Sequence, residues 1–258
     1  SETMESTSSL EFSEEFKKTA KQIKKFPLSR TAGGSVNHFF WKNNIGAYSE
    51  RQTPGKMWCY NRPQNFGPAE WVKQGEMIDP DCRYVVGINI LTEEPWLNGQ
   101  YAEYMTGDPE VSELAALRAD AGLPDPVDVY AYELGNEIDY TLSAEDYVKR
   151  AKASIREIKK VDPDAKFMAC GISYPVRFGN GGTLYAEEWR KWHKTILREI
   201  GDEIDYISYH MYYGWSVSGQ KEYIDMITND IREITGDDRI KIVITEQAVW
   251  TEVVGENN

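Results

Sequence analysis

Apolar, β-branched stretches alternate with amphipathic stretches along most of the chain. RYVVGINIL at 83–91 and IKIVIT at 240–245 have the composition of strands that are buried on both faces. Segments 186–200 and 218–235 instead carry apolar residues at helical spacing. Buried strands that alternate with amphipathic helices form parallel sheets covered by helices. The alternation therefore predicts an α/β protein.

The pattern predicts six strands, with a helical segment before the first and between each successive pair. Residues 1–10 are polar and are predicted to be a loose N-terminal segment, and 41–66 a long loop. No linker or repeat divides the chain, so a single barrel domain is predicted over 1–258. The strands are predicted at 27–30, 83–91, 127–134, 165–172, 204–209 and 240–245, and the helices at 12–26, 69–78, 95–121 with a break at 107–109, 143–161, 186–200 and 218–235.

Polar side chains follow the predicted strands at their carboxyl ends, which is where parallel α/β folds carry their sites. Six strands fit either a doubly wound sheet or most of an eight-stranded barrel. Polar groups at the same end of successive strands favour a (β/α)8 TIM-type barrel, incomplete in this chain. The residues at these ends are Asn89, Asn136 with Glu137, His210 with Tyr212, and Glu246.

The chain is strongly acidic, with 29 Lys and Arg, 42 Asp and Glu, and a net charge of −13 at pH 7. Phosphate backbones and anionic lipids repel such a chain, so no nucleic-acid or membrane partner is predicted. No apolar run approaches the ~20 residues that a membrane span needs.

Eight Trp and 16 Tyr supply flat faces that suit sugar rings, although core packing is their commoner use.

Motifs for metal and nucleotide binding are missing from the sequence. Cys59, Cys82 and Cys170 are far apart, and the three histidines form no cluster. Phosphate-loop and dinucleotide fingerprints are also absent, which argues against a nucleotide-dependent oxidoreductase. We therefore predict no metal ion and no organic cofactor. No signal peptide is visible at the first residue, and secreted and cytoplasmic locations both stay open.

Two carboxylates stand at strand ends that a barrel would place across its mouth. Glu137 follows the strand at 127–134, and Glu246 ends the strand at 240–245. Paired carboxylates are what glycoside hydrolysis requires, because one protonates the leaving oxygen while the other attacks carbon or activates water. With 42 acidic residues in the chain, two such placements can also arise by chance.

The sequence motifs around these carboxylates resemble those of retaining clan A glycoside hydrolases, most closely the α-L-arabinofuranosidase family. ELGNEID at 133–139 looks like the acid/base motif on the fourth barrel strand, and IVITEQAVW at 242–250 resembles the seventh, nucleophile strand. IDYISYHMYYG at 204–214 resembles the sixth strand. RTAGG at 30–34 with the following Phe-Trp and Ile-Gly, and LR at 117–118 with GLPDP at 122–126, are similar to stretches earlier in the family.

The resemblance implies a role for each site residue. Glu137 would be the general acid/base and Glu246 the nucleophile. Asn136 would bind the sugar 2-hydroxyl, and Tyr212 would hold the nucleophile. The remaining implied substrate-binding residues are His210 beside the nucleophile, Asn89 on a hydroxyl, Arg30 near the carboxylates, and Trp250 as a stacking surface.

The chain departs from the family pattern at Thr31-Ala32 and at Gln247, near the expected sugar pocket. It resembles strands two to seven, so a missing segment or a partner chain would complete the barrel. The implied function is retaining hydrolysis of α-L-arabinofuranosyl or related bonds in plant-type polysaccharide, with oligo- or polysaccharide as substrate. The alternative is a non-catalytic carbohydrate-binding or assembly protein built on a truncated glycosidase barrel.

Overall fold

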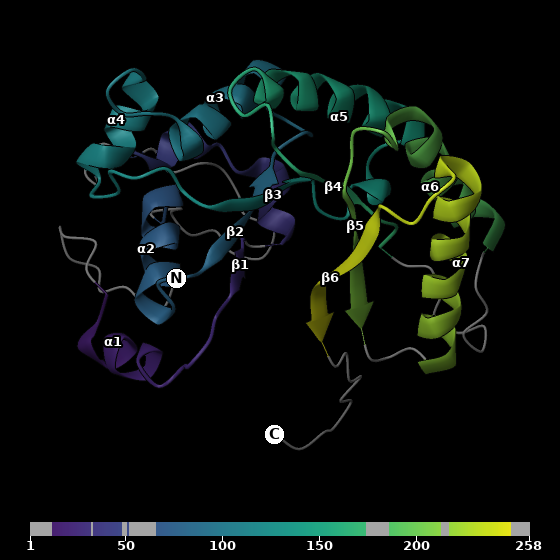
Figure 1. The fold of residues 1–258 in the computed structure, drawn as a ribbon, viewed down its shortest axis with the longest axis horizontal. Coiled ribbons are helices and arrows are strands. Elements are labelled where there is room, and N and C mark those ends of the chain that lie inside the picture. The colour runs from purple at the N-terminus through teal and green to yellow at the C-terminus, as the bar shows by residue number, and fades with distance from the viewer. Residues whose placement is uncertain are drawn as a thin grey trace. The chain divides into compact units, whose positions relative to one another are not determined.

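A computed structural model describes residues 12–31, 33–47, 51, 66–173, 186–212 and 217–248 (Figure 1). Its six strands are hydrogen-bonded in chain order, β1-β2-β3-β4-β5-β6, and the pairs β1–β2, β4–β5 and β5–β6 are parallel. A doubly wound sheet would reverse this order at a switch point, whereas a TIM-type barrel keeps it. The predicted fold class is therefore confirmed. The strands are β1 (Leu28–Arg30), β2 (Arg83–Ile88), β3 (Val129–Leu134), β4 (Phe167–Cys170), β5 (Tyr206–Tyr212) and β6 (Lys241–Ala248).

The helices also follow the predicted order, and the predicted break near 107–109 separates α3 from α4. α1 ends six residues earlier than expected, because the N–H groups of Gln22 and Ile23 donate to carbonyls three residues back and the helical pattern stops there. Farther along, the Phe26 N–H donates to the Asp79 carboxylate at 2.8 Å. The α-helices are α1 (Glu14–Ala20), α2 (Pro68–Ile78), α3 (Pro95–Thr106), α4 (Glu113–Asp120), α5 (Ala144–Lys159), α6 (Ala186–Ile200) and α7 (Val217–Thr235), and the short 3-10 helices are η1 (Gly34–His38), η2 (Trp41–Asn44) and η4 (Ile138–Tyr140).

The chain forms two compact units. The first comprises Ser1–Tyr132 with Ala153–Lys166, and the second Glu133–Lys152 with Phe167–Asn258. The single domain over 1–258 stays a prediction.

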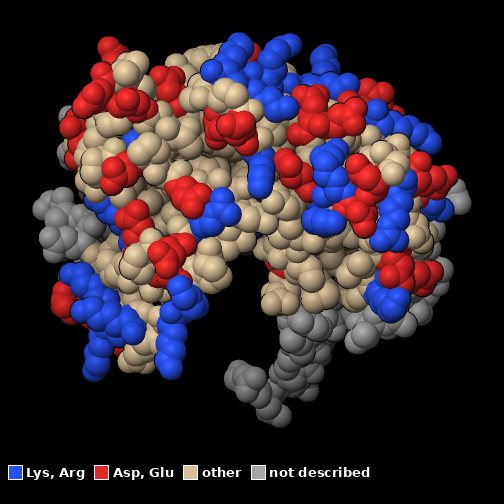
Figure 2. Space-filling view, in the orientation of Figure 1, with Lys and Arg blue, Asp and Glu red and all other residues tan. Residues whose placement is uncertain are grey.

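No helix in the described part of the chain is long and apolar enough to cross a bilayer. Acidic and basic side chains are interspersed over the face seen in Figure 2, so the negative charge is spread there rather than gathered in one field.

An aromatic cluster forms the core of the first unit. The fully buried Trp41 ring stacks on Tyr101 with centroids 5.2 Å apart, and its indole N–H donates to the Leu97 carbonyl at 3.1 Å. Trp71 of α2 meets Tyr84 of β2 edge to face at 5.0 Å. Aromatic pairs of this kind contribute about 0.5–1.5 kcal/mol beyond the area they bury. These contacts fix η2 against α3, and α2 against β2.

Arg118 ties together the carboxyl end of α3 and the segment after α4. Its side chain is fully buried, and its guanidinium donates to five carbonyl oxygens at 2.9–3.2 Å. Burial lowers the pKa of this group below its usual value. These carbonyls include the last ones of α3, which have no partner within the helix. The acceptors are those of Tyr104, Met105, Gly107, Leu123 and Pro124.

We expect Arg118→Ala to lower the free energy of unfolding by about 3–5 kcal/mol, because five buried or partly buried carbonyls lose the guanidinium as a donor together, and of these the Met105 carbonyl keeps the Val127 N–H. Urea unfolding followed by circular dichroism measures the loss. Arg118→Lys is the matched control, and it should recover only part of the stability because an ammonium donates at most three hydrogen bonds. A lysine variant as stable as wild type would contradict the role assigned to the guanidinium fork.

Glu93 is a buried carboxyl group in the loop between β2 and α3. The residue is 8% exposed, and burial raises its pKa to about 8, with Lys42 acting in the opposite direction. Among the described residues no hydrogen bond or ion pair reaches its carboxyl group. The ordinary pKa of 4.5 applies in the unfolded chain. The unfolded chain therefore loses this proton at a lower pH than the folded one.

This difference makes stability fall as the pH rises from about 4.5 to 8, since only the folded state then holds the proton. We expect Glu93→Gln to remove that loss. The stability of the variant relative to wild type should grow by on the order of 2–4 kcal/mol between pH 5 and pH 8. Thermal unfolding of both proteins at the two pH values tests this, and an equal difference at both would contradict it.

The second unit is held by buried polar contacts between its helices and strands. α6 and α7 pack side by side (Figure 1). The fully buried Asp230 of α7 pairs with Arg190 and Lys194 of α6. His193 of α6 is fully buried, with its Nε2 3.2 Å from the Tyr223 hydroxyl of α7, and burial lowers its pKa to about 3. His193 is therefore neutral at physiological pH and serves the core of this unit.

Candidate active site

Glu137 follows β3 in an uncommon backbone conformation. Gly135 turns the chain with φ 82°, and Glu137 has φ 47° and ψ 40°, the one left-handed non-glycine residue in the described ranges. Such a conformation costs a non-glycine residue on the order of 1–3 kcal/mol and persists only where neighbouring contacts hold it. It lets Glu137 point away from the strand end while Ile138 beside it is fully buried.

Contacts on both sides of Glu137 hold this turn. The Tyr147 hydroxyl of α5 donates to the Leu134 carbonyl at 3.1 Å and accepts from the Cys170 N–H at 2.8 Å. It thereby joins the carboxyl ends of β3 and β4. On the other side, Asp139 accepts hydrogen bonds from the backbone N–H of Ser173, at 3.1 Å, and from its hydroxyl. Burial raises the pKa of Asp139, and the Ser173 bonds oppose that shift.

His210 and Glu246 reach one face because β6 contains a bulge. Tyr209 is paired with Ile244, and the next pair is His210 with Glu246, so Thr245 is the extra residue. Tyr209 faces α7, where its ring meets Tyr223 at 4.4 Å. Side chains alternate along a strand, so His210 faces the opposite way. Without the bulge Glu246 would share the face of Ile244.

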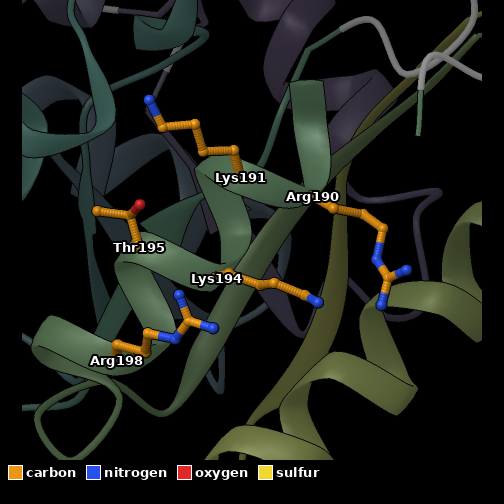
Figure 3. A pocket seen from close by; sticks show the side chains of 5 residues that line it. All are labelled: Arg190, Lys191, Lys194, Thr195 and Arg198. Atoms are coloured by element: carbon orange, nitrogen blue, oxygen red, sulfur yellow. The ribbon is translucent and has the colours of Figure 1, made fainter. Parts of the chain in front are cut away.

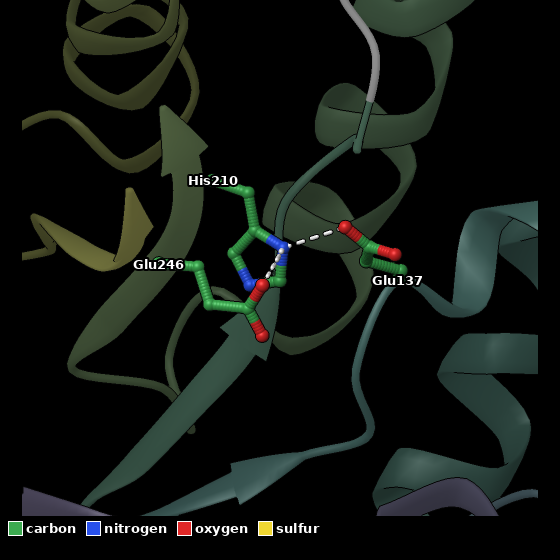
Figure 4. Close-up of side chains that lie close together, drawn as sticks. All are labelled: Glu137, His210 and Glu246. Carbon is green, nitrogen blue, oxygen red and sulfur yellow. Dashed lines mark hydrogen bonds and ion pairs between the residues drawn. The ribbon is translucent and has the colours of Figure 1, made fainter. Parts of the chain in front are cut away.

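Glu137, His210 and Glu246 converge within the second unit (Figure 4). His210 Nδ1 lies 2.8 Å from Glu137 Oε1 and 3.7 Å from Glu246 Oε2. One donor atom from each residue lies within 4.8 Å of the other two. The side chain of His210 is 5% exposed, whereas those of Glu137 and Glu246 are 27% and 26% exposed. The imidazole is thus buried behind two carboxylates that solvent can reach.

This arrangement suits proton transfer and nucleophilic attack. A 2.8 Å contact between Nδ1 and a carboxylate oxygen is a hydrogen bond and places one proton between the two atoms. Two carboxylates and one imidazole are also a donor set that can bind a transition metal. Nδ1 and Oε1 are closer than the roughly 3.4 Å expected of two tetrahedral ligands about 2.1 Å from an ion, which favours a shared proton.

The expected neighbour of His210 was Glu246, and the shorter contact is instead with Glu137. Asn136 is 2% exposed and directly precedes Glu137. Tyr212 is the last residue of β5, and the structure describes its backbone alone, opposite Ala248. Trp250 lies outside the described residues. The roles implied for these residues stay predictions.

Asn89 and Arg30 belong to the first unit. Asn89 is buried and organises its own loop, since its amide group donates to the Thr92 hydroxyl at 2.8 Å and accepts from the Thr92 backbone N–H at 2.9 Å. Arg30 ends β1 opposite Val85 and is half-buried. Their proposed contacts with substrate stay predictions.

Sequence reasoning did not identify Asp139, Ser173 or the bulge at Thr245. Asp139 lies within the ELGNEID motif at 133–139, two residues after Glu137, and this position in the sequence could have identified it. Nothing local marks Ser173 or Thr245, because their roles depend on neighbours 34 residues away, in the case of Ser173, and on the register of β5 with β6.

A cavity of about 300 Å³ lies elsewhere in the second unit, along α6 (Figure 3). Its lining is basic, but the side chains do not converge, since Lys191 points away from Arg190 and Lys194 (Figure 3). The last two are already paired with Asp230. The Glu137–His210–Glu246 cluster is therefore the stronger candidate site. The cavity is lined by Arg190, Lys191, Lys194, Thr195 and Arg198.

Sequence comparison shows similarity to arabinofuranosidases. The family profile described as "Alpha-L-arabinofuranosidase 1 domain" matches residues 22–176, more than half of the chain. An intracellular exo-α-(1→5)-L-arabinofuranosidase of Streptomyces lividans is 29% identical over 189 residues, which are 70% of this chain and 27% of that protein. The enzyme of the same description from Halalkalibacterium halodurans is 29% identical over 197 residues, 73% of this chain and 37% of its own.

Solved structures show the same relationship. An α-L-arabinofuranosidase of Thermotoga maritima in an arabinose complex superimposes with a TM-score of 0.79 and 26% identity, over 97% of this chain and 52% of that one. The family 51 enzyme of Thermotoga petrophila gives 0.77 and 26%, over 94% and 50%. The chain thus spans about a third of these curated relatives and about half of these solved chains. On the family match and this shared barrel fold, the chain belongs to the α-L-arabinofuranosidase family, glycoside hydrolase family 51.

Proposed function

We propose that this chain carries the catalytic pair of a retaining α-L-arabinofuranosidase, with Glu246 as nucleophile and Glu137 as general acid/base. The observation that carries the proposal is the spacing of the pair. Oxygen atoms of the two carboxylates lie within 4.8 Å of each other. Retaining glycosidases hold their carboxylates about 5–5.5 Å apart, whereas inverting ones keep roughly 6.5–9.5 Å to admit a water molecule.

The reaction takes place in two displacements. A Glu246 oxygen attacks the anomeric carbon while the glycosidic C–O bond breaks and Glu137 gives its proton to the leaving oxygen. Water then attacks the same carbon, Glu137 takes the water proton, and the bond to Glu246 breaks. Each displacement inverts the anomeric carbon, so the product retains the configuration of the substrate.

His210 is proposed to govern where the acid proton resides. Its Nδ1 shares a hydrogen bond with Glu137 and lies 3.7 Å from Glu246, so it lies between the proposed acid/base and the proposed nucleophile. Asn136 is proposed to bind the 2-hydroxyl, and Tyr212, Trp250, Arg30 and Asn89 to complete the sugar site, as the family resemblance implies. The relatives' names support α-1,5-linked arabinofuranosyl groups as the first substrates to test.

The test is hydrolysis of an aryl α-L-arabinofuranoside and of α-1,5-arabino-oligosaccharide, with proton NMR of the first-formed anomer. We expect arabinose to be released first as the α anomer. Release of the β anomer would refute the retaining mechanism. Binding of arabino-oligosaccharide without any release of arabinose would favour the alternative of a non-catalytic carbohydrate-binding protein.

A further inference from the structure

The first unit contains an exposed aromatic ring and, three residues earlier in the chain, a buried acid with no partner in the described ranges. Trp96, in the first turn of α3, is 53% exposed. Three residues earlier, Glu93 is 8% exposed and receives no hydrogen bond or ion pair from the described residues. A single exposed aromatic residue needs no explanation. A buried carboxyl group without a partner does, because its burial costs free energy that folding does not recover.

Solvent still reaches the Glu93 carboxyl group. The fully enclosed polar atoms without a partner in the described part of the chain belong to other residues, among them the Tyr101 hydroxyl. A ligand hydroxyl at the surface could therefore donate to Glu93. Burial raises the pKa of Glu93 to about 8, and among the described residues no hydrogen bond offsets that shift.

Lys42 holds the Trp96 ring in place. Its ammonium lies over Trp96 at 5.4 Å and over the buried Trp41 at 5.6 Å from the ring centroids. It also donates to the Gln100 side chain at 2.5 Å, one turn along α3 from Trp96. Cation–π contacts of this kind add roughly 0.5–1 kcal/mol each at exposed sites. The ring is thus held by its neighbours while much of its surface stays open.

We propose that Trp96, Glu93 and Lys42 form a carbohydrate-binding platform that takes a neutral sugar unit of an oligo- or polysaccharide. The indole offers an apolar surface for the C–H face of a sugar ring, Glu93 accepts from a hydroxyl, and Lys42 donates to a ring or hydroxyl oxygen. The pKa of Glu93, about 8, leaves its carboxyl group uncharged at neutral pH, and the exposed Glu94 next to it balances Lys42, so the platform offers no net positive charge to attract a uronate and suits a neutral sugar. The choice of carbohydrate rests on the proposed function.

The experiment measures binding without turnover. Affinity electrophoresis in the Glu246→Gln background compares linear arabinan with polygalacturonate, for the parent and for Trp96→Ala, Trp96→Phe and Glu93→Gln. We expect about tenfold weaker arabinan binding for Trp96→Ala, a smaller loss for Glu93→Gln, and partial recovery for Trp96→Phe. Tyr130→Ala is the matched control in the same unit, because Tyr130 also carries a cation, Arg83 at 5.0 Å. It should bind like the parent.

Each outcome decides the proposal. Arabinan binding that is absent in the parent, or unchanged in Trp96→Ala, overturns it. An equal loss in Tyr130→Ala also overturns it, as does a Trp96-dependent preference for polygalacturonate. If Trp96→Ala fails to fold by circular dichroism, Trp96→Phe and Glu93→Gln decide. Failure of the wild-type chain to hydrolyse aryl arabinofuranoside would refute the proposed activity and leave the binding result to stand on its own.

Discussion

Replacement of Glu246 by Ala should abolish turnover of aryl arabinofuranoside, with kcat reduced by a factor on the order of 10⁴ or more. The side chain that would form the covalent intermediate is then missing, and the space it leaves is open to small anions because Glu246 is a quarter exposed. Azide should restore turnover by attacking the anomeric carbon directly. That single displacement yields a glycosyl azide of inverted configuration, which NMR identifies.

Glu145→Ala supplies the control, since Glu145 is exposed on α5 and makes one distant ion pair, with Lys191 at 3.9 Å. It should keep the wild-type rate and show no response to azide. A Glu246→Ala protein that folds and still hydrolyses the substrate at the wild-type rate would exclude Glu246 as nucleophile. Azide product of retained configuration would exclude the single-displacement rescue.

Replacement of Glu137 by Ala should cost about 10²–10⁴-fold on substrates with poor leaving groups, because general acid catalysis contributes about that much. Activated aryl arabinofuranosides need little protonation, so their first step should survive. Their second step loses its general base, and the covalent intermediate should then accumulate as a burst. Stopped-flow release of the aryl group measures the burst, and intact mass spectrometry detects the sugar attached to Glu246.

Azide should speed the Glu137→Ala variant as well, but here through the intermediate on Glu246. The product is then a glycosyl azide of retained configuration, opposite to that expected of Glu246→Ala. The two variants are thus distinguished by stereochemistry and not by rate alone. An equal loss on good and poor leaving groups would contradict the acid role of Glu137.

The order and type of the main elements could be read from the sequence, because the signals are local. Apolar strands such as β2 and the helical spacing of α6 and α7 report burial and periodicity directly, and α6 begins and ends where predicted. The cap at Ser143 was also visible. Its hydroxyl accepts from the Asp146 N–H at 3.1 Å, while the return bond runs to the Asp146 carboxylate from the hydroxyl rather than from the backbone.

The positions of Glu137 and Glu246 at strand ends were likewise readable, since Gly-Asn-Glu and Thr-Glu follow strand patterns. The geometry of these two residues could not be read from the sequence. The left-handed turn at Glu137 depends on Tyr147 and Asp139, and the placement of Glu246 beside His210 depends on one extra residue in β6. A shift of one residue moves a strand side chain to the opposite face.

The sequence by itself therefore determined the α/β class, the strand order and the two carboxylates, because hydrophobic periodicity and turn residues act over a few neighbouring positions. Only the tertiary structure decided the closer pairing of His210 with Glu137, the hydrogen bonds of Arg118 to five carbonyls, and the burial of Glu93 without a partner among the residues that the structure describes. The His210 and Arg118 contacts join atoms of residues 73 and up to 14 positions apart, and Glu93 is buried by the packing around its loop. Distances and burial of that kind are set by packing and register, which no local pattern encodes.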